Sequence, residues 1–192
     1  MQLIFATHNT HKVSEIKRIL PPQIHLITPY EMGFTGDIPE TGKTLEENAL
    51  QKAVYIFEKY KQSCLADDTG LEVDALGGRP GVYSARYADE EGNAEKNIEK
   101  LLHELEGTQN RSAVFKTVIA IIINGQQTLF EGSVKGKITR IKQGKSGFGY
   151  DPVFIPDGQS LSYAQMSMDE KNALSHRAIA VEKLFLFLKK CS

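Results

Sequence analysis

The sequence of 192 residues contains no tryptophan, only two cysteines and no excess of either charge. Cys64 and Cys191 form neither a metal-ligand spacing nor a disulfide framework, which is typical of a protein from a reducing compartment. With 23 basic and 24 acidic residues, the chain has no general electrostatic attraction to nucleic acid or to an anionic membrane. We therefore expect a cytoplasmic protein with neither nucleic acid nor membrane as a partner.

Long hydrophobic runs are also missing. The N-terminal segment has only about five apolar residues before polar ones follow, so we expect no signal peptide. No stretch approaches the roughly 20 apolar residues that a membrane helix requires. The apolar run at residues 118–123 is short and β-branched, which indicates a buried strand instead.

Short strands and amphipathic helices alternate along the chain. Strands are predicted at residues 3–6, 24–27, 64–67, 71–73, 112–123, 127–141 and 152–155, and helices at residues 10–20, 45–61, 92–105 and from about residue 175. Asn124-Gly125 is a strong hairpin signal between two of the strands. This mixture is typical of an α/β or α+β fold, and at this length the chain can bury a sizeable core. We expect an α/β fold that forms a single domain of residues 1–192, with a cleft between two lobes.

The first candidate site is the polar segment of residues 7–12, Thr-His-Asn-Thr-His-Lys, between the first strand and the first helix. Backbone N–H groups at a helix start, together with hydroxyl, amide and lysine side chains, can cradle phosphate. The segment is not a P-loop, because the glycines are absent and Lys12 comes too early. The plainer alternative is a cap that only begins the helix.

The second candidate is a set of carboxylates: Glu40, Glu47, Asp67 and Asp68. Mg²⁺ takes one or two carboxylates together with phosphate oxygens and water, and a further carboxylate can orient or deprotonate that water. Asp67 and Asp68 follow an apolar run, and we expect them at the end of a strand. A simple turn at Asp68 is the alternative, but a charge at a buried edge is costly unless a cation compensates it.

The third candidate combines a glycine-rich loop with two later segments. Gly147 and Gly149 flank Phe148, so the backbone can approach a ligand and the ring is available to stack on a flat base. Lys171 and the segment of residues 175–177, Ser-His-Arg, supply cationic donors near predicted helix starts. Taken singly, a plain turn and ordinary helix capping explain these residues equally well.

Five segments in order resemble one family over nearly the whole chain: FATHNTHKVSEI, ETGKTLEENALQKA, ADDTGLEVDALGGRPGVYSARYA, SGFGYDPVF and DEKNALSHRAIA. They resemble the inosine triphosphate pyrophosphatases, also called dITP/XTP pyrophosphatases. The resemblance implies an elongated two-lobed α/β fold with a mixed sheet, the nucleotide in the cleft, and a homodimer. It also implies Mg²⁺-dependent hydrolysis of ITP, dITP and XTP to the monophosphate and pyrophosphate, which keeps these nucleotides out of DNA and RNA.

The resemblance also implies a role for individual residues. Glu40 and Asp68 would hold Mg²⁺, and Asp68 would be the catalytic proton acceptor. Substrate would be bound by Thr7, His8, Asn9, Thr10, His11, Lys12, Lys52, Thr69, Phe148, Gly149, Tyr150, Asp151, Lys171, His176 and Arg177. Many relatives have Ser in place of Thr69, which keeps the hydroxyl. Many carry other residues, often Gly or Asn, in place of His8 and His11, so we expect contact there through the backbone alone.

A purine with a 6-oxo group offers an acceptor where adenine offers a donor. We expect Arg177 or a backbone N–H to face that atom and so to reject adenine. The alternatives are a pyrophosphatase of similar fold for pyrimidine or modified nucleotides, a binding protein without catalysis, and a phosphatase with an aspartate nucleophile. The last needs alternating DxDxT spacing, which Asp67-Asp68-Thr69 does not have.

Overall fold

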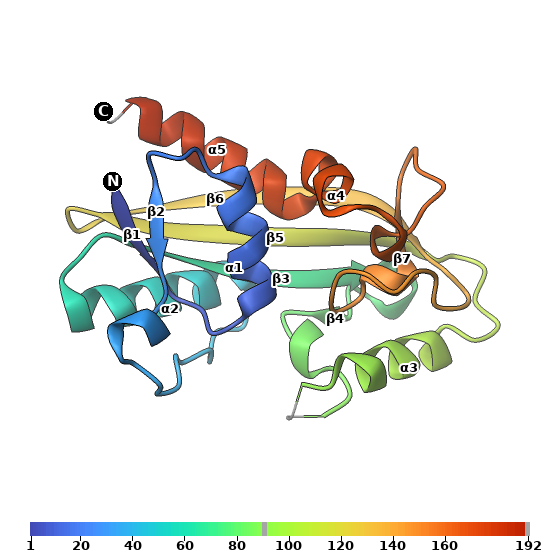
Figure 1. Ribbon diagram of the computed structural model, residues 1–192. Helices are drawn as coiled ribbons and strands as arrows, with labels where there is room; N and C mark the ends of the chain where they lie inside the picture. The colour runs from blue at the N-terminus through green and yellow to red at the C-terminus, as the bar shows by residue number, and fades with distance from the viewer. Residues whose placement is uncertain (90–91, 191–192) are drawn as a thin grey trace. The chain divides into compact units, whose positions relative to one another are not determined.

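The computed structural model describes residues 1–89 and 92–190 (Figure 1). The strands are β1 (Gln2–Phe5), β2 (His25–Ile27), β3 (Cys64–Val73), β4 (Pro80–Gly81), β5 (Ser112–Ile123), β6 (Gln126–Ile138) and β7 (Phe154–Pro156). The α-helices are α1 (Thr10–Ile19), α2 (Leu45–Tyr60), α3 (Ala94–Glu104), α4 (Met168–Leu174) and α5 (His176–Lys190). Among the described residues, no helix is long and apolar enough to cross a membrane.

The strands form one mixed sheet. Six of them follow the order β2-β1-β3-β5-β6-β7, and β4 pairs with β3 beside this path. β1 runs parallel to β2 and β3, whereas β4 and β7 run antiparallel to β3 and β6 respectively. Parallel pairs connected through helices are the mark of an α/β fold, so the predicted fold class is confirmed.

The chain divides into two compact units. Unit 1 consists of residues 1–68, 117–132 and the described residues from 177 onward, and unit 2 of the described residues in 69–116 and 133–176. β3, β5 and β6 each contribute residues to both units, because the division falls after Asp68, after Lys116 and after Gly132.

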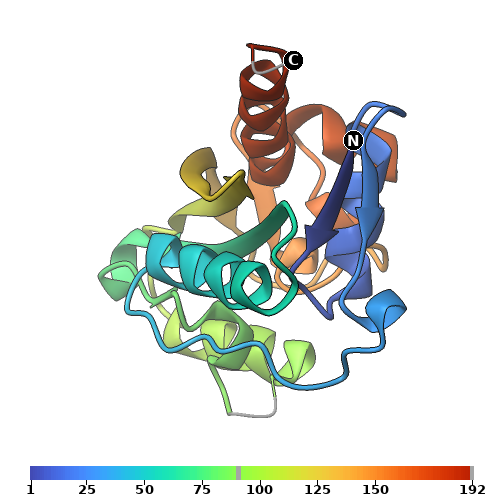
Figure 2. The same ribbon diagram turned by 90° about the vertical axis from the view of Figure 1, so that its left-hand side faces the viewer.

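Unit 1 has a core built from strand and helix side chains. Leu3 and Phe5 of β1 pack with Ile16 of α1, Leu65 of β3 and Leu184 of α5. β1 and β2 lie side by side in this unit, as the end-on view shows (Figure 2). The 3.6-residue spacing of the apolar residues in α1 gives that helix its buried face, as the sequence predicts.

Unit 2 has a separate core rich in aromatic rings. Phe115 contacts Phe154 edge to face, with ring centroids 4.9 Å apart, and Tyr163 lies 5.3 Å from Phe154. Ile98 and Leu101 of α3 belong to the same cluster. The predicted apolar face of this helix is therefore confirmed for these two residues.

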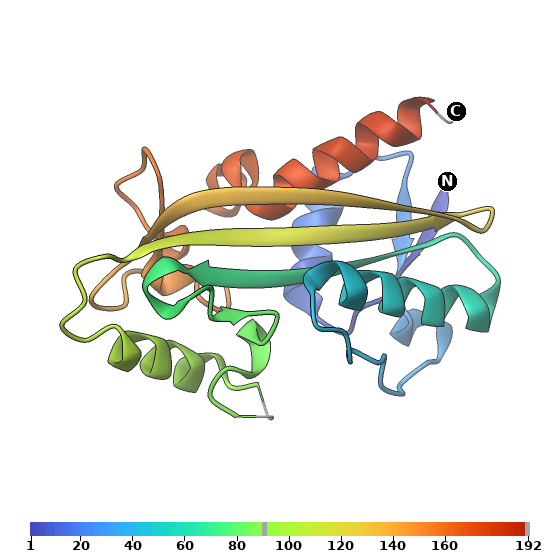
Figure 3. The same cartoon turned by 180° about the vertical axis from the view of Figure 1, so that it is seen from behind.

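The long hairpin of β5 and β6 also confirms the prediction (Figure 3). Asn124 and Gly125 both have positive φ, 51° and 78°. Two such residues in sequence suit the tight turn that joins right-twisted antiparallel strands. The second strand ends at Ile138, earlier than the predicted residue 141.

The predicted strand end at Asp67 and Asp68 is wrong. Residues 64–73 form the single strand β3, which pairs with β1 at Cys64 and Leu65 and with β4 from Leu71 onward. The two aspartates thus lie inside a buried strand. Cations from segments remote in sequence compensate their charges, so local turn chemistry does not decide the conformation.

Two other boundaries differ from the prediction. The expected strand at residues 152–155 begins with a short 3₁₀ turn, Asp151–Val153, and β7 follows it at Phe154. The helix expected from about residue 175 begins at His176, because α4 ends at Leu174 and Ser175 between them is extended. Among the described residues, the buried Cys64 has no disulfide partner, and Cys191 lies outside them.

Candidate active site

The segment of residues 7–12 forms a helix cap. The Asn9 side-chain oxygen accepts hydrogen bonds from the backbone N–H groups of His11 (3.0 Å) and Lys12 (3.2 Å). Thr7 Oγ1 in turn accepts from the backbone N–H of Asn9 (3.1 Å). The helix cap, which the sequence offered as the plainer alternative to a phosphate cradle, is thus present. It engages backbone N–H groups that a phosphate cradle would need.

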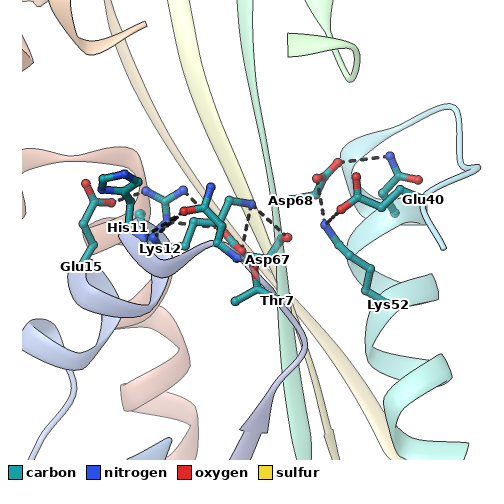
Figure 4. A network of polar contacts seen from close by, with 11 residues as sticks. Thr7, His11, Lys12, Glu15, Glu40, Lys52, Asp67 and Asp68 are labelled. Atoms are coloured by element: carbon teal, nitrogen blue, oxygen red, sulfur yellow. Dashed lines mark hydrogen bonds and ion pairs between the residues drawn. The ribbon is translucent and has the colours of Figure 1, made fainter. Parts of the chain in front are cut away.

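Asp67 lies in a buried network of two carboxylates and two cations in unit 1 (Figure 4). Lys12 Nζ is 3.1 Å from Asp67 Oδ1, and the Nε and Nη2 atoms of Arg177 each donate to Asp67 Oδ2 at 3.2 Å. Arg177 also donates through Nη1 to Glu15. Buried charges persist only when they are paired in this way, so the four side chains stabilise one another.

The pKa values follow from burial and pairing. Burial acts most strongly on Asp67 and favours the neutral acid, but Lys12 and Arg177 outweigh it and hold the pKa of Asp67 well below its usual value. For Lys12 burial dominates and lowers the pKa, although Asp67 opposes it. For Arg177 the neighbouring Asp67 and Glu15 outweigh burial and raise the pKa.

We predicted that Arg177 or a backbone N–H faces the purine 6-position, and this stays a prediction. The structure buries Arg177 in unit 1 with an exposed fraction of 1%. Its guanidinium is paired with the carboxylates of Asp67 and Glu15. The sequence carries no signal for this contact beyond the position of Glu15 in the amphipathic helix α1.

Asp68 belongs to a second cluster. Lys52 Nζ lies 3.1 Å from Asp68 Oδ1 and also donates to Glu40, and Asn48 Nδ2 donates to Asp68 Oδ2 at 3.3 Å. Asn48 and Lys52 are four residues apart and therefore share one face of α2. Successive side chains of a strand point to opposite sides, which directs Asp67 toward α1 and α5 and Asp68 toward α2 (Figure 4).

Burial sets the direction in which the pKa of Asp68 is shifted. It raises the pKa of the Asp68 carboxyl, and the Lys52 and Lys12 ammonium groups oppose this only in part. Burial also acts most strongly on Lys52, but Asp68 and Glu40 outweigh it and raise the Lys52 pKa. The site thus combines a lysine held charged with a carboxylate of raised basicity, an arrangement suited to accepting a proton.

Glu40 and Asp68 fit a magnesium site by donor type and by convergence. Both carboxylates reach the same Lys52 ammonium, so a single cationic position lies within range of both. Their hard oxygen atoms suit Mg²⁺, which needs only one or two protein carboxylates when phosphates and water complete its shell. The described residues contain no group of three or more His, Cys, Asp or Glu side chains that could hold a metal ion. Glu47 is not part of the cluster, because its carboxylate caps the backbone N–H of Lys43 at 2.6 Å.

Unit 2 holds the residues of the glycine-rich loop. Asp151 Oδ2 accepts hydrogen bonds from the backbone N–H of Phe148 (2.8 Å) and from Lys171 Nζ (2.5 Å). Lys171 Nζ also lies 4.9 Å from the Phe148 ring centroid and 5.4 Å from that of Tyr163. Gly147 has a φ of 76°, and a Cβ there would overlap Asp151 Oδ2. Glycine at this position therefore permits the loop to close on Asp151.

Two other predicted residues of unit 2 are packed inside it. The His176 ring stacks on Phe115 at 4.6 Å with an interplanar angle of 18°, and Tyr150 Oη donates to the Ser84 carbonyl at 2.9 Å. Burial raises the pKa of Tyr150. Elsewhere in unit 2, a cavity of about 510 Å³ is lined by the loop around Phe148 and the first turn of α3. Thr69 is half-buried in β3, and Gly149 lies in the same loop as Phe148.

The remaining predicted residues lie at the surface of unit 1. Thr10 and His11 begin α1 and are exposed, and so is His8. His8 nevertheless makes a side-chain contact that the sequence did not reveal: its Nε2 lies 2.9 Å from the Gly36 carbonyl oxygen.

Comparison with known proteins identifies the family. The profile of the Ham1 family matches residues 3–187. The dITP/XTP pyrophosphatase of Christiangramia forsetii is 50% identical over 190 residues, with 99% of this chain and 100% of that protein covered. The dITP/XTP pyrophosphatase of Bacillus subtilis is 46% identical, with 98% and 97% covered. The Staphylococcus aureus Ham1 protein superposes with a TM-score of 0.90 at 40% identity, and 100% of each chain is covered. The predicted family resemblance is confirmed, and the chain belongs to the Ham1 family.

Proposed function

We propose that this protein is a Mg²⁺-dependent nucleoside triphosphate pyrophosphatase that hydrolyses dITP, ITP and XTP to the monophosphate and pyrophosphate. The observation that carries the proposal is the convergence of Glu40, which is partly exposed, and the buried Asp68 on the Lys52 ammonium. The names of the relatives, dITP/XTP pyrophosphatase, supply the class of substrate. In the cell, this hydrolysis in the cytoplasm keeps deaminated purine nucleotides out of DNA and RNA.

Glu40 and Asp68 would hold the magnesium ion, which when bound would neutralise phosphate charge and make water a stronger nucleophile. Asp68 accepts the proton of the attacking water, and its carboxylate lies in the same cluster as Glu40 and Lys52. Lys12 and Lys52 contribute positive charge toward the triphosphate, which carries about four negative charges. Attack next to the α-phosphate then releases pyrophosphate as a unit.

The loop of unit 2 provides groups that suit a purine. Phe148 offers a ring for stacking, and Lys171 is a cationic donor beside that ring. A buried donor that faces the 6-position can donate a hydrogen bond to the oxo group of hypoxanthine or xanthine. It leaves the adenine amino group without an acceptor, and such pairing can discriminate by about 10⁴-fold. We propose that the protein forms a homodimer, which is the usual assembly of the inosine triphosphate pyrophosphatases that it resembles.

A substrate panel tests the proposal. Pyrophosphate release is measured with ITP, XTP, ATP, GTP, dTTP and UTP at equal concentration, with Mg²⁺ and with a chelator. We expect rapid release from ITP and XTP only, and none with the chelator. Equal or faster release from UTP or dTTP would instead favour a pyrophosphatase for pyrimidine nucleotides.

A further inference from the structure

His8 links the capped segment before α1 to the loop that carries Glu40. Its Nε2 donates to the Gly36 carbonyl oxygen at 2.9 Å, since a carbonyl can only accept. Its ring stacks on that of Phe34, with centroids 6.1 Å apart and an interplanar angle of 18°. One imidazole therefore holds two points of the loop at once.

Phe34 is itself held by α2. Its ring centroid lies 6.1 Å from that of Tyr55, and Lys59 Nζ lies 5.0 Å from it. A Cβ at Gly36 would come within 3.1 Å of the Phe34 ring, so the backbone that accepts from His8 lies directly against this aromatic side chain. His8, Phe34 and Gly36 thus form one packed contact, which we call the His8 contact.

Separate hydrogen bonds lie at the two ends of the segment of residues 28–42, which includes Glu40. At the start, the Thr28 backbone N–H donates to Glu31 at 2.6 Å. At the end, the backbone N–H groups of Thr41 and Gly42 donate to Gln51 (2.8 Å) and Asn48 (2.7 Å) of α2. The His8 contact lies between these ends and four residues before Glu40, where it restricts the path of the chain into the carboxylate cluster.

We propose that His8 is a positioning residue that holds the loop of residues 34–40 so that Glu40 meets the magnesium ion beside Asp68. The inference rests on the proposed function, because it assigns His8 a part in that same site. A loop already ordered before the metal arrives loses less conformational entropy on binding, so the contact increases the apparent affinity for Mg²⁺. A single exposed hydrogen bond with a ring contact corresponds to about a three- to tenfold effect.

Three substitutions separate the two parts of the contact. His8→Ala removes both, His8→Gln keeps an N–H donor, and His8→Phe keeps a stacking ring. His103→Ala is the matched control, because His103 is an exposed histidine on α3 in unit 2. Thermal unfolding of each variant verifies that the fold is retained.

Hydrogen exchange of the metal-free protein tests the contact without reference to activity. We expect amides in residues 34–42 to exchange about three- to tenfold faster in His8→Ala, with intermediate rates in the Gln and Phe variants. Exchange in the α3 peptides should not change. Unaltered exchange in residues 34–42 would overturn the proposal.

The Mg²⁺ dependence of pyrophosphate release tests the consequence for Glu40. At saturating ITP, His8→Ala should raise the Mg²⁺ concentration for half-maximal rate about three- to tenfold while the rate at saturating Mg²⁺ changes less than twofold. In a Glu40→Gln background the same substitution should add nothing, because the positioned group is gone. An equal shift in both backgrounds, or no shift, would contradict the role of His8. If the unaltered protein releases no pyrophosphate from ITP, the proposed function fails, and the exchange experiment still decides whether His8 orders the loop.

Discussion

At the scale of single residues, two adjacent aspartates acquire different chemistry from the side of β3 on which they lie. Asp67 is paired with Lys12 and Arg177, which lower its pKa. Asp68 shares Lys52 with Glu40, and burial raises its pKa. The family resemblance implied metal binding and proton acceptance for Asp68, whereas the sequence placed Asp67 only among the candidate carboxylates. The pairing of Asp67 depends on Arg177, 110 residues further along the chain, which spacing alone does not reveal.

Replacement of Asp68 by Asn tests the proton acceptor. The amide keeps the size of the side chain but accepts no proton, so we expect turnover of ITP to fall by at least about 10²-fold while nucleotide binding remains. Steady-state pyrophosphate release and equilibrium binding of ITP measure the two effects. Asp74→Asn, at an exposed position of unit 2, is the control and should behave as the unaltered protein. Turnover of Asp68→Asn at the normal rate would refute the assignment.

Asp67 should contribute to stability in a pH-dependent manner. Its folded pKa lies below the unfolded value of 3.8, so the contribution is fully present above that value and is lost as the pH falls toward the folded pKa. Asp67→Asn should be less stable at pH 7, because Lys12 and Arg177 lose their partner, but should lose less of its remaining stability between pH 5 and about pH 2. Urea unfolding across this pH range measures both the stability at pH 7 and its loss toward low pH. Parallel pH profiles for the two proteins would contradict the pairing.

At the scale of elements, the sequence predicted most helices and strands because their apolar residues follow the right period. Ile16 in α1 and Leu101 in α3 lie where their helical spacing put them, and Asn124-Gly125 forms the predicted turn. The continuous β3 was missed because Asp, Thr and Gly are turn formers locally. In the fold, the pairing with β1 and β4 and the distant cations outweigh that preference.

The turn before Phe148 provides a prediction at this scale. Gly147→Ala introduces a methyl group into the position of Asp151 Oδ2, so the Asp151 contacts to Phe148 and Lys171 should be disrupted. We expect the KM for ITP to rise about tenfold or more, because the ring and the lysine lose their common anchor. Gly158→Ala is the matched control: Gly158 has a similar φ of 78°, but no atom lies within 4 Å of its added Cβ. If both variants raise KM equally, backbone strain and not the Asp151 contact explains the effect.

At the scale of the whole molecule, the chain is a member of the Ham1 family whose chemical groups are divided between two units. Unit 1 carries the carboxylates, lysines and helix cap, and unit 2 carries the aromatic loop with Lys171. Motif order along the sequence was sufficient to predict the family, since five segments in one order constrain the whole chain. It could not predict the buried partner of Arg177 or the His8 contact, because both depend on side chains that only the tertiary fold brings together.

The measurement that tests the central claim most directly is product identification by ³¹P NMR after incubation of ITP with the purified protein and Mg²⁺. The account predicts inosine monophosphate and pyrophosphate in equal amounts, with no orthophosphate and no reaction once the metal is chelated. Release of orthophosphate, or hydrolysis at an undiminished rate without a divalent cation, would contradict it.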